Sequence, residues 1–405
     1  MLTRVRNEYF AWGWLLIAWL PLLQIIGRGV FNIVGAAALL WAAIALSGRR
    51  IVIDRALLSL YAILVLTFLL SVAVAGDRSV AWHHWYEYFL YTLFCLFTLA
   101  TLQHVNAGLS RFLRALGWSG LTMVVILYAW LVVQVQQPGF SPERIMREDN
   151  LPLLAPFMLY TIQHVFRLKH WRWISLLVLL PVFGYVVGSE GRAALVGLCI
   201  GLLAYSRLVS GIRLRNTIPI ALAGIVIAMF LHQGQFRLGA SEGGTFAHTL
   251  DKLSTYRTAI WRHALANPPE NIWLGTGMGN VRDHPEILTI RLADNTKIQV
   301  GKHLHNFVLD CWYATGMLGL AALLAWLGFL IWRSLRTWRQ ATNLLRAQVG
   351  TLIAAGFAIL GNAFLSYSYG SKQFGVYLFT FLVVAAYARR GDSLPVNEAQ
   401  GPPHT

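Results

Sequence analysis

The sequence has few charged residues for its length. Only 12% of the 405 residues are Asp, Glu, Lys or Arg, whereas 57% are hydrophobic. A soluble globule of this size needs far more polar surface than these residues provide. The composition therefore excludes a soluble globular protein and predicts an all-α polytopic membrane protein.

The sequence also has few cysteines and no clear signal-peptide cleavage site. The three cysteines, Cys95, Cys199 and Cys311, lie within apolar runs, so they form neither a disulfide framework nor a metal-ligand spacing and are predicted to pack. The first apolar run follows Arg4 and Arg6, but no clear small-residue cleavage site separates it from the next run. We interpret it as an uncleaved first helix rather than a signal peptide.

Long apolar runs dominate what is present. Crossing ~30 Å of hydrocarbon takes about 20 residues, which predicts about twelve transmembrane helices. The runs centre on residues 12–26, 30–46, 57–75, 80–102, 116–134, 151–166, 173–188, 193–206, 216–232, 304–332, 348–367 and 373–388. The chain thus divides into nine spans (1–232), one large loop with amphipathic helices (233–302), three spans (303–390) and a polar tail (391–405) expected to be disordered.

Basic residues outnumber acidic ones, 33 against 17, and their positions indicate topology. Most of them fall in alternate short loops, which the positive-inside rule assigns to the cytoplasm together with both termini. The large loop is then external. Because the charge is spread along the chain and not gathered on one face, the sequence predicts no nucleic-acid partner.

Arg257 is one basic residue that topology does not explain. If residues 249–265 form a helix, Arg257 lies within the apolar stripe of Leu250, Leu253, Ile260, Trp261 and Ala264, whereas Lys252, Arg262 and His263 lie on the other side. A guanidinium on a face that packs toward the membrane domain needs an anion there, either a bound ligand or a carboxylate in a structural salt bridge. We favour the ligand.

Arg192 is a second exception, expected at the outer start of a helix after Gly188-Ser189-Glu190-Gly191. The positive end of a helix dipole disfavours a cation but favours an anion, so a ligand could accept both the N–H groups and the guanidinium. Local pairing with Glu190 is the alternative. The sequence favours a second anion-binding arginine.

Two histidines open the next long apolar run, in Lys302-His303-Leu304-His305-Asn306. If a helix starts here, His305 shares a face with Leu309, Trp312, Gly316 and Gly319, and these small residues predict that the face points into the bundle. His305 is then the better candidate for a general base near neutral pH. His303, with Asn306 and Asp310 near it, is expected to form a supporting pair with Asp310.

The order of these motifs resembles a known family. Ser189-x-x-Arg192 is followed by Arg257-x-x-x-Trp261, by the glycine-rich run 274–279, by His305-Asn306-x-x-Leu309 and by Gly316-x-x-Gly319. This order around one large loop resembles the bacterial O-antigen ligase and polymerase superfamily, and twelve helices with a single large loop look more like the ligases. The resemblance implies a glycosyltransferase class C-like fold and no cofactor or metal.

The resemblance also implies a reaction and its partners. An O-antigen ligase transfers polysaccharide from an undecaprenyl pyrophosphate donor to lipid A-core at the periplasmic face of the bacterial inner membrane. By motif position the family's essential residues fall on Arg192, Arg257 and His305. The arginines suit stabilisation of a pyrophosphate leaving group, with Arg147, Arg262 and Lys302 as possible outer members, and His305 suits proton removal from the acceptor hydroxyl.

Other interpretations stay open. No Asp-x-Asp motif occurs and the expected first external loop, around Gly27-Arg28-Gly29, has no carboxylate, which weakens a metal-dependent transferase. A polymerase of the same superfamily would use a polyprenyl-linked acceptor. A transporter or flippase commonly has inverted repeats, and no repeat is evident here. The segment Trp82-His83-His84-Trp85 resembles an aromatic belt, and Gly275-Thr276-Gly277-Met278-Gly279 follows no predicted strand, so it indicates a loop and not a nucleotide-binding motif.

Overall fold

The computed structural model of the 405-residue chain describes most of the predicted membrane helices. The described residues are 17–23, 28–47, 53–105, 107–136, 150–167, 170–188, 192–211, 256–280, 289–291, 297–299, 304–366, 368–371 and 373–389. The expected span at 216–232 and the tail at 391–405 lie outside these ranges. Only part of the expected first span, residues 17–23, lies within them.

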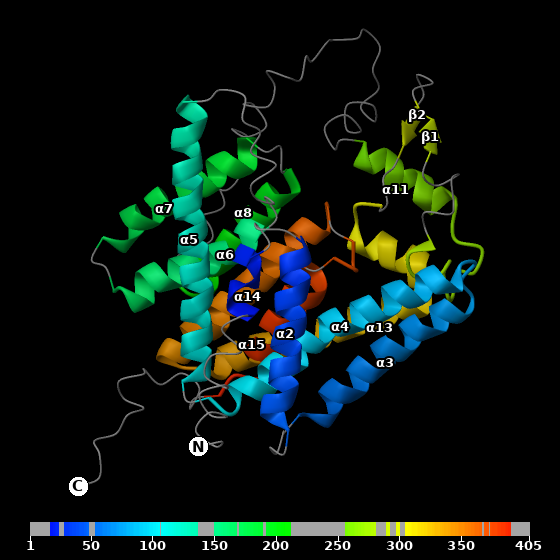
Figure 1. Cartoon of the computed structure of the whole chain (residues 1–405), viewed down its shortest axis with the longest axis horizontal. Coiled ribbons are helices and arrows are strands. Elements are labelled where there is room, and N and C mark those ends of the chain that lie inside the picture. Colours follow the sequence, from blue (N-terminus) through cyan, green and yellow to red (C-terminus); the bar gives the residue numbers. More distant parts are fainter. Residues whose placement is uncertain are drawn as a thin grey trace.

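Helices make up nearly all of the described structure (Figure 1). In the first half they are α2 (Arg28–Leu46), α3 (Arg55–Ala73), α4 (Arg78–Leu102), α5 (Gly108–Gln136), α6 (Asn150–Tyr160) with the π-helical turn η2 (Thr161–Val165), α7 (Trp171–Gly188) and α8 (Arg192–Leu208). In the second half they are α11 (Arg257–Ala266), α13 (Phe307–Gln340), α14 (Asn343–Ala363) and the π-helical turn η4 (Gln373–Leu378) leading into α15 (Phe379–Tyr387).

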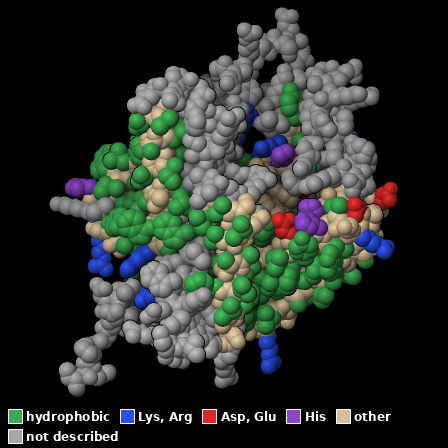
Figure 2. Space-filling model, viewed as in Figure 1, with side chains coloured by type: hydrophobic (Ala, Val, Ile, Leu, Met, Phe, Trp, Pro, Cys, Tyr) green, Lys and Arg blue, Asp and Glu red, His purple; other side chains and the backbone are tan. Residues whose placement is uncertain are grey.

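Four described helical segments are long and apolar enough to cross a bilayer: Arg55–Ala73, Gly108–Trp130, Phe307–Gln340 and Asn343–Ala363. Several helices also expose large apolar side chains, such as Leu66 of α3 (57% exposed) and Leu180 of α7 (63% exposed). Hydrophobic side chains cover much of the lower part of the face in Figure 2. Such a surface is unfavourable in water and favourable against lipid, so the helices belong to a membrane protein.

The three cysteines pack inside this bundle. Cys95 and Cys311 are fully buried, Cys199 is 6% exposed, and all three are free thiols. The packing role predicted for them is confirmed.

The all-α expectation is confirmed for the described bundle, and one small β-ribbon accompanies the helices. Strand β1 (Thr289–Arg291) pairs antiparallel with β2 (Lys297–Gln299), with Ile290 opposite Ile298. Alternating residues such as Ile290-Arg291 and Lys297-Ile298 suit a short ribbon with two different faces. The ribbon contacts α11. Both elements lie within residues 233–302, the region predicted as the large loop.

Helices α8 and α14 form the closest antiparallel pair, and glycines permit the approach. A Cβ atom on Gly197 would lie 2.6 Å from the carbonyl oxygen of Ala358, and one on Gly201 would lie 2.7 Å from the Cβ of Ala358. At the other end, a Cβ on Gly350 would lie 3.2 Å from the carbonyl oxygen of Leu208. Small residues at such positions let helix backbones approach closely in membranes. The start of α8 therefore lies level with the end of α14.

Helix α13 differs from the expected helix over residues 304–332. It begins at Phe307, ends at Gln340, and is interrupted at Gly316, where φ is 67° and ψ is −171°. Gly316 was predicted to face another helix, as a small packing residue. It is instead the point at which the helix breaks, because this backbone conformation is accessible only to glycine.

The loop from Asn271 to Asn280 fills the break in α13. Its N–H groups at Thr276 and Gly277 donate to the carbonyl oxygens of Tyr313 (2.9 Å) and Ala314 (3.0 Å). In return, Met317 donates to the carbonyl oxygen of Ile272 (2.9 Å). The loop therefore satisfies backbone groups that the break removes from the helix, as burial within a membrane protein requires.

We expect Gly316→Ala to destabilise the protein, because the new Cβ would lie 2.2 Å from the Trp273 backbone and alanine resists a φ of 67°. The free energy of unfolding should fall by about 2 kcal/mol or more. Gly328→Ala is the matched control, since Gly328 lies in the same helix and its Cβ would meet nothing within 4 Å. Thermal unfolding in detergent measures both. Equal midpoints would contradict the assigned role of Gly316.

Candidate functional site

The end of α14 is where the candidate residues meet. Three consecutive residues after this helix, Phe364, Leu365 and Ser366, offer backbone carbonyl oxygens. The side chain of Asn306 donates to Phe364 (3.2 Å), the guanidinium of Arg257 donates from Nη1 to Leu365, and the imidazole of His305 lies within hydrogen-bonding reach of Ser366. The large loop and the start of α13 are thereby joined to one short segment.

Asn306 fixes the start of α13. Its side-chain oxygen accepts from the N–H groups of Val308 (2.9 Å) and Leu309 (3.2 Å), which is the hydrogen-bonding pattern of an N-cap residue. The same side chain donates to Phe364, so one amide both caps α13 and ties it to the end of α14. This role was not part of the sequence prediction, which grouped Asn306 with His303.

His305 lies outside the helix, which corrects the helical-wheel argument for it. Its φ is 55°, a left-handed conformation that a non-glycine residue adopts only when its surroundings hold it there. The side chain is half-buried, and its Nδ1 atom is buried with no hydrogen-bond partner among the described residues. His305 therefore reaches the site from a strained turn and not from a helix face.

Asp310 stabilises the turn that carries His305. Its carboxylate, in a residue that is 3% exposed, accepts from the backbone N–H of Leu304 (2.7 Å) and interacts with the Ser368 side chain. The residue thus contacts both the turn and the segment that follows α14. The pairing with His303 stays a prediction, since His303 lies outside the described residues.

Helix α11 presents Arg257 toward this segment. The predicted apolar face is confirmed for Ile260, Trp261 and Ala264, which pack against Leu304 and Tyr313 of the α13 region. The indole Nε1 of Trp261 also donates to the carbonyl oxygen of Leu304 (3.0 Å). Docking through this face directs the first residue of the helix to the end of α14.

The start of the expected helix changes. It begins at Arg257 and not at Thr249, because Tyr256 has a left-handed φ of 62° that ends any helix coming before it. Leu250 and Leu253 lie outside the described residues. Arg262 is exposed, as expected of the solvent side, and its guanidinium makes a long 3.4 Å contact with the Thr258 carbonyl oxygen.

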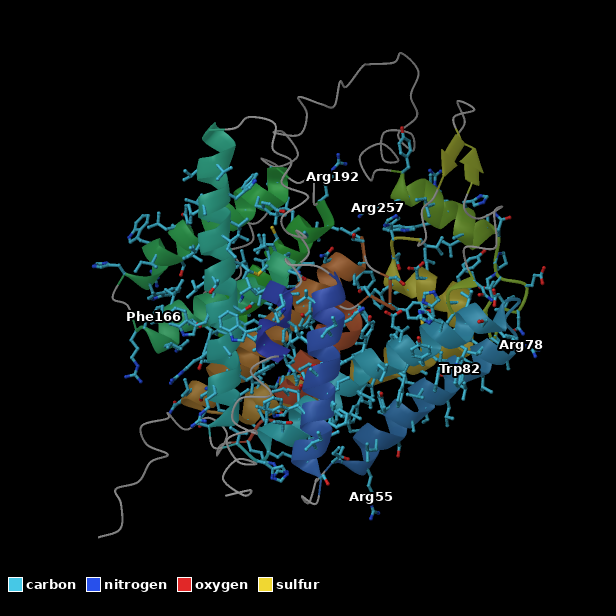
Figure 3. All side chains as sticks on the ribbon, in the orientation of Figure 1. Arg55, Arg78, Trp82, Phe166, Arg192 and Arg257 are labelled. Atoms are coloured by element: carbon cyan, nitrogen blue, oxygen red, sulfur yellow. The ribbon has the colours of Figure 1, made fainter. Side chains whose placement is uncertain are left out.

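Arg192 is the first residue of α8, as predicted. Because α8 and α14 run antiparallel with Gly197 beside Ala358 and Asn362, the start of α8 lies near the end of α14. Figure 3 shows Arg192 and Arg257 at the same end of the molecule, with Arg55 at the opposite end. In Figure 2, His and basic side chains also appear together in the upper centre of the face, beside α11. Two arginines and a histidine, remote in sequence, are gathered at one end of the bundle.

The environment of His305 favours its neutral form. Burial is the main cause that lowers its pKa below the ordinary value of 6.5, and the positive charge of Arg257 lowers it further. The Ser366 backbone opposes these effects only in part. At neutral pH the imidazole is therefore uncharged and able to accept a proton.

Some predicted residues are not brought into the site by the described structure. Arg147, Lys302 and His303 lie outside the described residues. In the part of the chain that the structure describes, no three His, Cys, Asp or Glu side chains are grouped as metal ligands.

Sequence reasoning missed the carbonyl groups of Phe364, Leu365 and Ser366, because main-chain acceptors carry no sequence signal. It also missed the loop from Asn271 to Asn280 as a partner of α13. The loop prediction for Gly275–Gly279 is confirmed. The signal available in the sequence was its three glycines, all of which have positive φ in the structure.

These features define a helical membrane protein with a polar site at one end of its bundle, built around arginine and histidine. Residues 176–324 match the family model described as O-antigen ligase. This segment, 149 of the 405 residues, is similar to the O-antigen ligase and polymerase superfamily, whose members are glycosyltransferase-like enzymes. The matched segment includes Arg192, Arg257 and His305. No curated protein matches the chain.

We expect Arg257→Gln to raise the pKa of His305, because it removes a nearby positive charge that disfavours the imidazolium. The pKa should remain below 6.5, since burial, the larger cause, persists. Histidine-labelled protein followed by NMR over a pH series, with His305→Gln to assign the signal, measures the change. Arg262→Gln is the control because Arg262 is exposed on the far side of α11. A similar shift in both variants, or none in Arg257→Gln, would contradict the assignment.

Proposed function

We propose that the protein is an O-antigen ligase that transfers polysaccharide from undecaprenyl pyrophosphate to the lipid A-core of lipopolysaccharide, at the periplasmic face of the bacterial inner membrane. The observation that carries the proposal is the gathering of Arg192, Arg257 and His305 at the end of α14, within a segment matching an O-antigen ligase family model. The predicted twelve spans, cytoplasmic termini and external loop would place that end of the bundle outside.

In the proposed reaction the arginines hold the donor. The bond between the anomeric carbon and the pyrophosphate oxygen breaks, and its electron pair goes to the pyrophosphate. Guanidinium groups positioned beforehand stabilise this developing charge without reorganisation. Arg192 adds the N–H groups at the start of α8, which also favour an anion. Arg147, Arg262 and Lys302 remain candidates for outer contacts.

His305 would act as the general base. The acceptor hydroxyl oxygen forms the new bond to the anomeric carbon while its proton passes to the imidazole. A neutral ring with a lowered pKa suits proton acceptance, and a buried Nδ1 without a partner is an acceptor that a substrate hydroxyl could satisfy. Asn306 and Asp310 would position the ring through the turn and the helix start.

The test of the proposed function is a transfer assay with purified protein, lipid-linked polysaccharide and rough lipopolysaccharide. Complementation of ligase-null and polymerase-null strains distinguishes the ligase from a polymerase. We also propose that transfer needs no metal, because arginines supply the positive charge that Mg²⁺ would otherwise provide. Undiminished transfer in excess EDTA is expected, and loss that Mg²⁺ or Mn²⁺ restores would contradict this.

We expect Arg192→Gln and Arg257→Gln each to reduce transfer about a hundredfold or more, the scale for removing one group that stabilises developing charge. Lysine should rescue poorly because it lacks the planar, bidentate guanidinium. Arg172→Gln, at the start of α7, is the control for loss of one surface charge and should stay near the wild-type rate. Full activity in Arg257→Gln would make that residue a structural tie between α11 and Leu365.

We expect His305→Ala to lose transfer while it still binds the lipid-linked donor, because the arginines lie on other elements. His303→Ala should have a milder effect. The wild-type rate should fall with decreasing pH only below 6.5, because the lowered pKa keeps the imidazole neutral above that value. Rates and donor binding measured over a pH series check both points. Inactive His303→Ala beside nearly normal His305→Ala would exchange the two roles.

A further inference from the structure

A polar cavity lies at the end of the α8–α14 pair opposite the candidate site. It has a volume of about 610 Å³, within the usual range for small-molecule sites. Its lining comes from η2, the last turn of α8, the end of α13 and the first turn of α14. Because α8 begins at Arg192 and the cavity lies where α8 ends, this cavity is separate from the candidate site.

Two arginines and a histidine converge on this cavity from three elements. Arg207 lies in the last turn of α8, Arg346 in the first turn of α14, and His164 in η2. None of the described lining residues is acidic. The Nε2 atom of His164 is also buried and has no hydrogen-bond partner within the described chain. A cavity with this lining favours an anion that can accept several hydrogen bonds.

Packing holds Arg346 in place beforehand. Its guanidinium carbon lies over the Trp338 ring, 4.4 Å from the centroid. The indole Nε1 of Trp338 in turn donates to the carbonyl oxygen of Leu208 (3.1 Å), which fixes the ring against the end of α8. An arginine stacked on a held aromatic ring loses little freedom when it binds a ligand.

The start of α14 borders the same cavity. Its N-cap, Thr342, makes no side-chain hydrogen bond to the first turn, and no acidic residue occurs in that turn. Asn343 and Leu344, the first two residues of the helix, line the cavity. The N–H groups and the helix dipole therefore add to the positive potential of the arginines.

We propose that this cavity binds a phosphate ester anion, held by Arg207, Arg346 and the N–H groups at the start of α14. The ester could be the headgroup of an anionic membrane lipid or a soluble phosphate ester, since both present the same oxygens. Basic pockets between transmembrane helices bind such headgroups in membrane proteins. Under the predicted topology this end of the bundle faces the cytoplasm, so the bound anion would meet the protein on the side opposite the transfer reaction.

The test uses the purified full chain in a neutral detergent, with phosphatidylglycerol as the probe. Native mass spectrometry counts bound lipid, and the midpoint of thermal unfolding reports stabilisation. We expect phosphatidylglycerol to bind and to raise the midpoint, and diacylglycerol with the same acyl chains to do neither. Arg207→Gln/Arg346→Gln should weaken binding about tenfold or more, the scale expected for losing two arginine contacts.

A matched control separates this site from general surface charge. Arg172 and Arg336 each lie over a Trp ring at 5.7 Å, as Arg346 lies over Trp338, yet neither lines this cavity, so Arg172→Gln/Arg336→Gln removes the same charge elsewhere. It should bind phosphatidylglycerol like wild type. Equal weakening in the two double variants, or none in Arg207→Gln/Arg346→Gln, would overturn the proposal.

A competition arm identifies the source of the anion. Glycerol phosphate and inorganic phosphate are added to protein that carries phosphatidylglycerol. If either displaces the lipid and raises the midpoint in wild type but not in Arg207→Gln/Arg346→Gln, the site takes soluble phosphate esters. If neither does, the site takes the lipid headgroup. Both results support phosphate binding at this cavity.

Discussion

The close contact between α8 and α14 is the constraint on which the rest of the site depends. Gly197 and Gly201 bring the two backbones together, and the antiparallel arrangement places the start of one helix beside the end of the other. Helix ends carry unpaired backbone groups, with donors at the start and acceptors at the end. The contact therefore brings the N–H groups of α8 and the carbonyl oxygens that follow α14 to the same end of the bundle.

The carbonyl oxygens after α14 then organise the other candidate residues. Phe364 receives Asn306, Leu365 receives Arg257, and Ser366 lies beside His305. These ties reach α11 and α13, which also pack against each other through Ile260, Ala264 and Tyr313. A guanidinium beside a helix's acceptor end is well stabilised there, since that end carries partial negative charge. Burial is the main cause that lowers the pKa of the neighbouring imidazole, and the same guanidinium lowers it further, so one residue contributes to the geometry and to the electrostatics of the site.

The break at Gly316 completes the arrangement, because it gives the Asn271–Asn280 loop a place in the bundle. The loop exchanges backbone hydrogen bonds with α13 on both sides of the break. It directly follows α11, so its attachment also limits where α11 can lie. Each exchanged pair satisfies a donor and an acceptor that the break would otherwise leave unpaired.

Composition and motif order predicted the class of protein, most of the described helices and the three principal candidate residues. Apolar runs of bilayer length predicted the positions of α3, α5 and α14, since burial in lipid constrains composition strongly. Arg192 at a helix start and Arg257 within an apolar stripe could be found because a cation in either place conflicts with its surroundings.

How those residues are held could be seen only in the folded chain. His305 lies on a left-handed turn and not on a helix face, because Asn306 caps α13 after it and Asp310 holds Leu304 before it. Gly316 breaks the helix that sequence periodicity would continue. The partners of Asn306, Arg257 and His305 after α14 are main-chain carbonyl oxygens. Every residue has such an oxygen, so no pattern of side chains could have revealed which ones the fold would bring together.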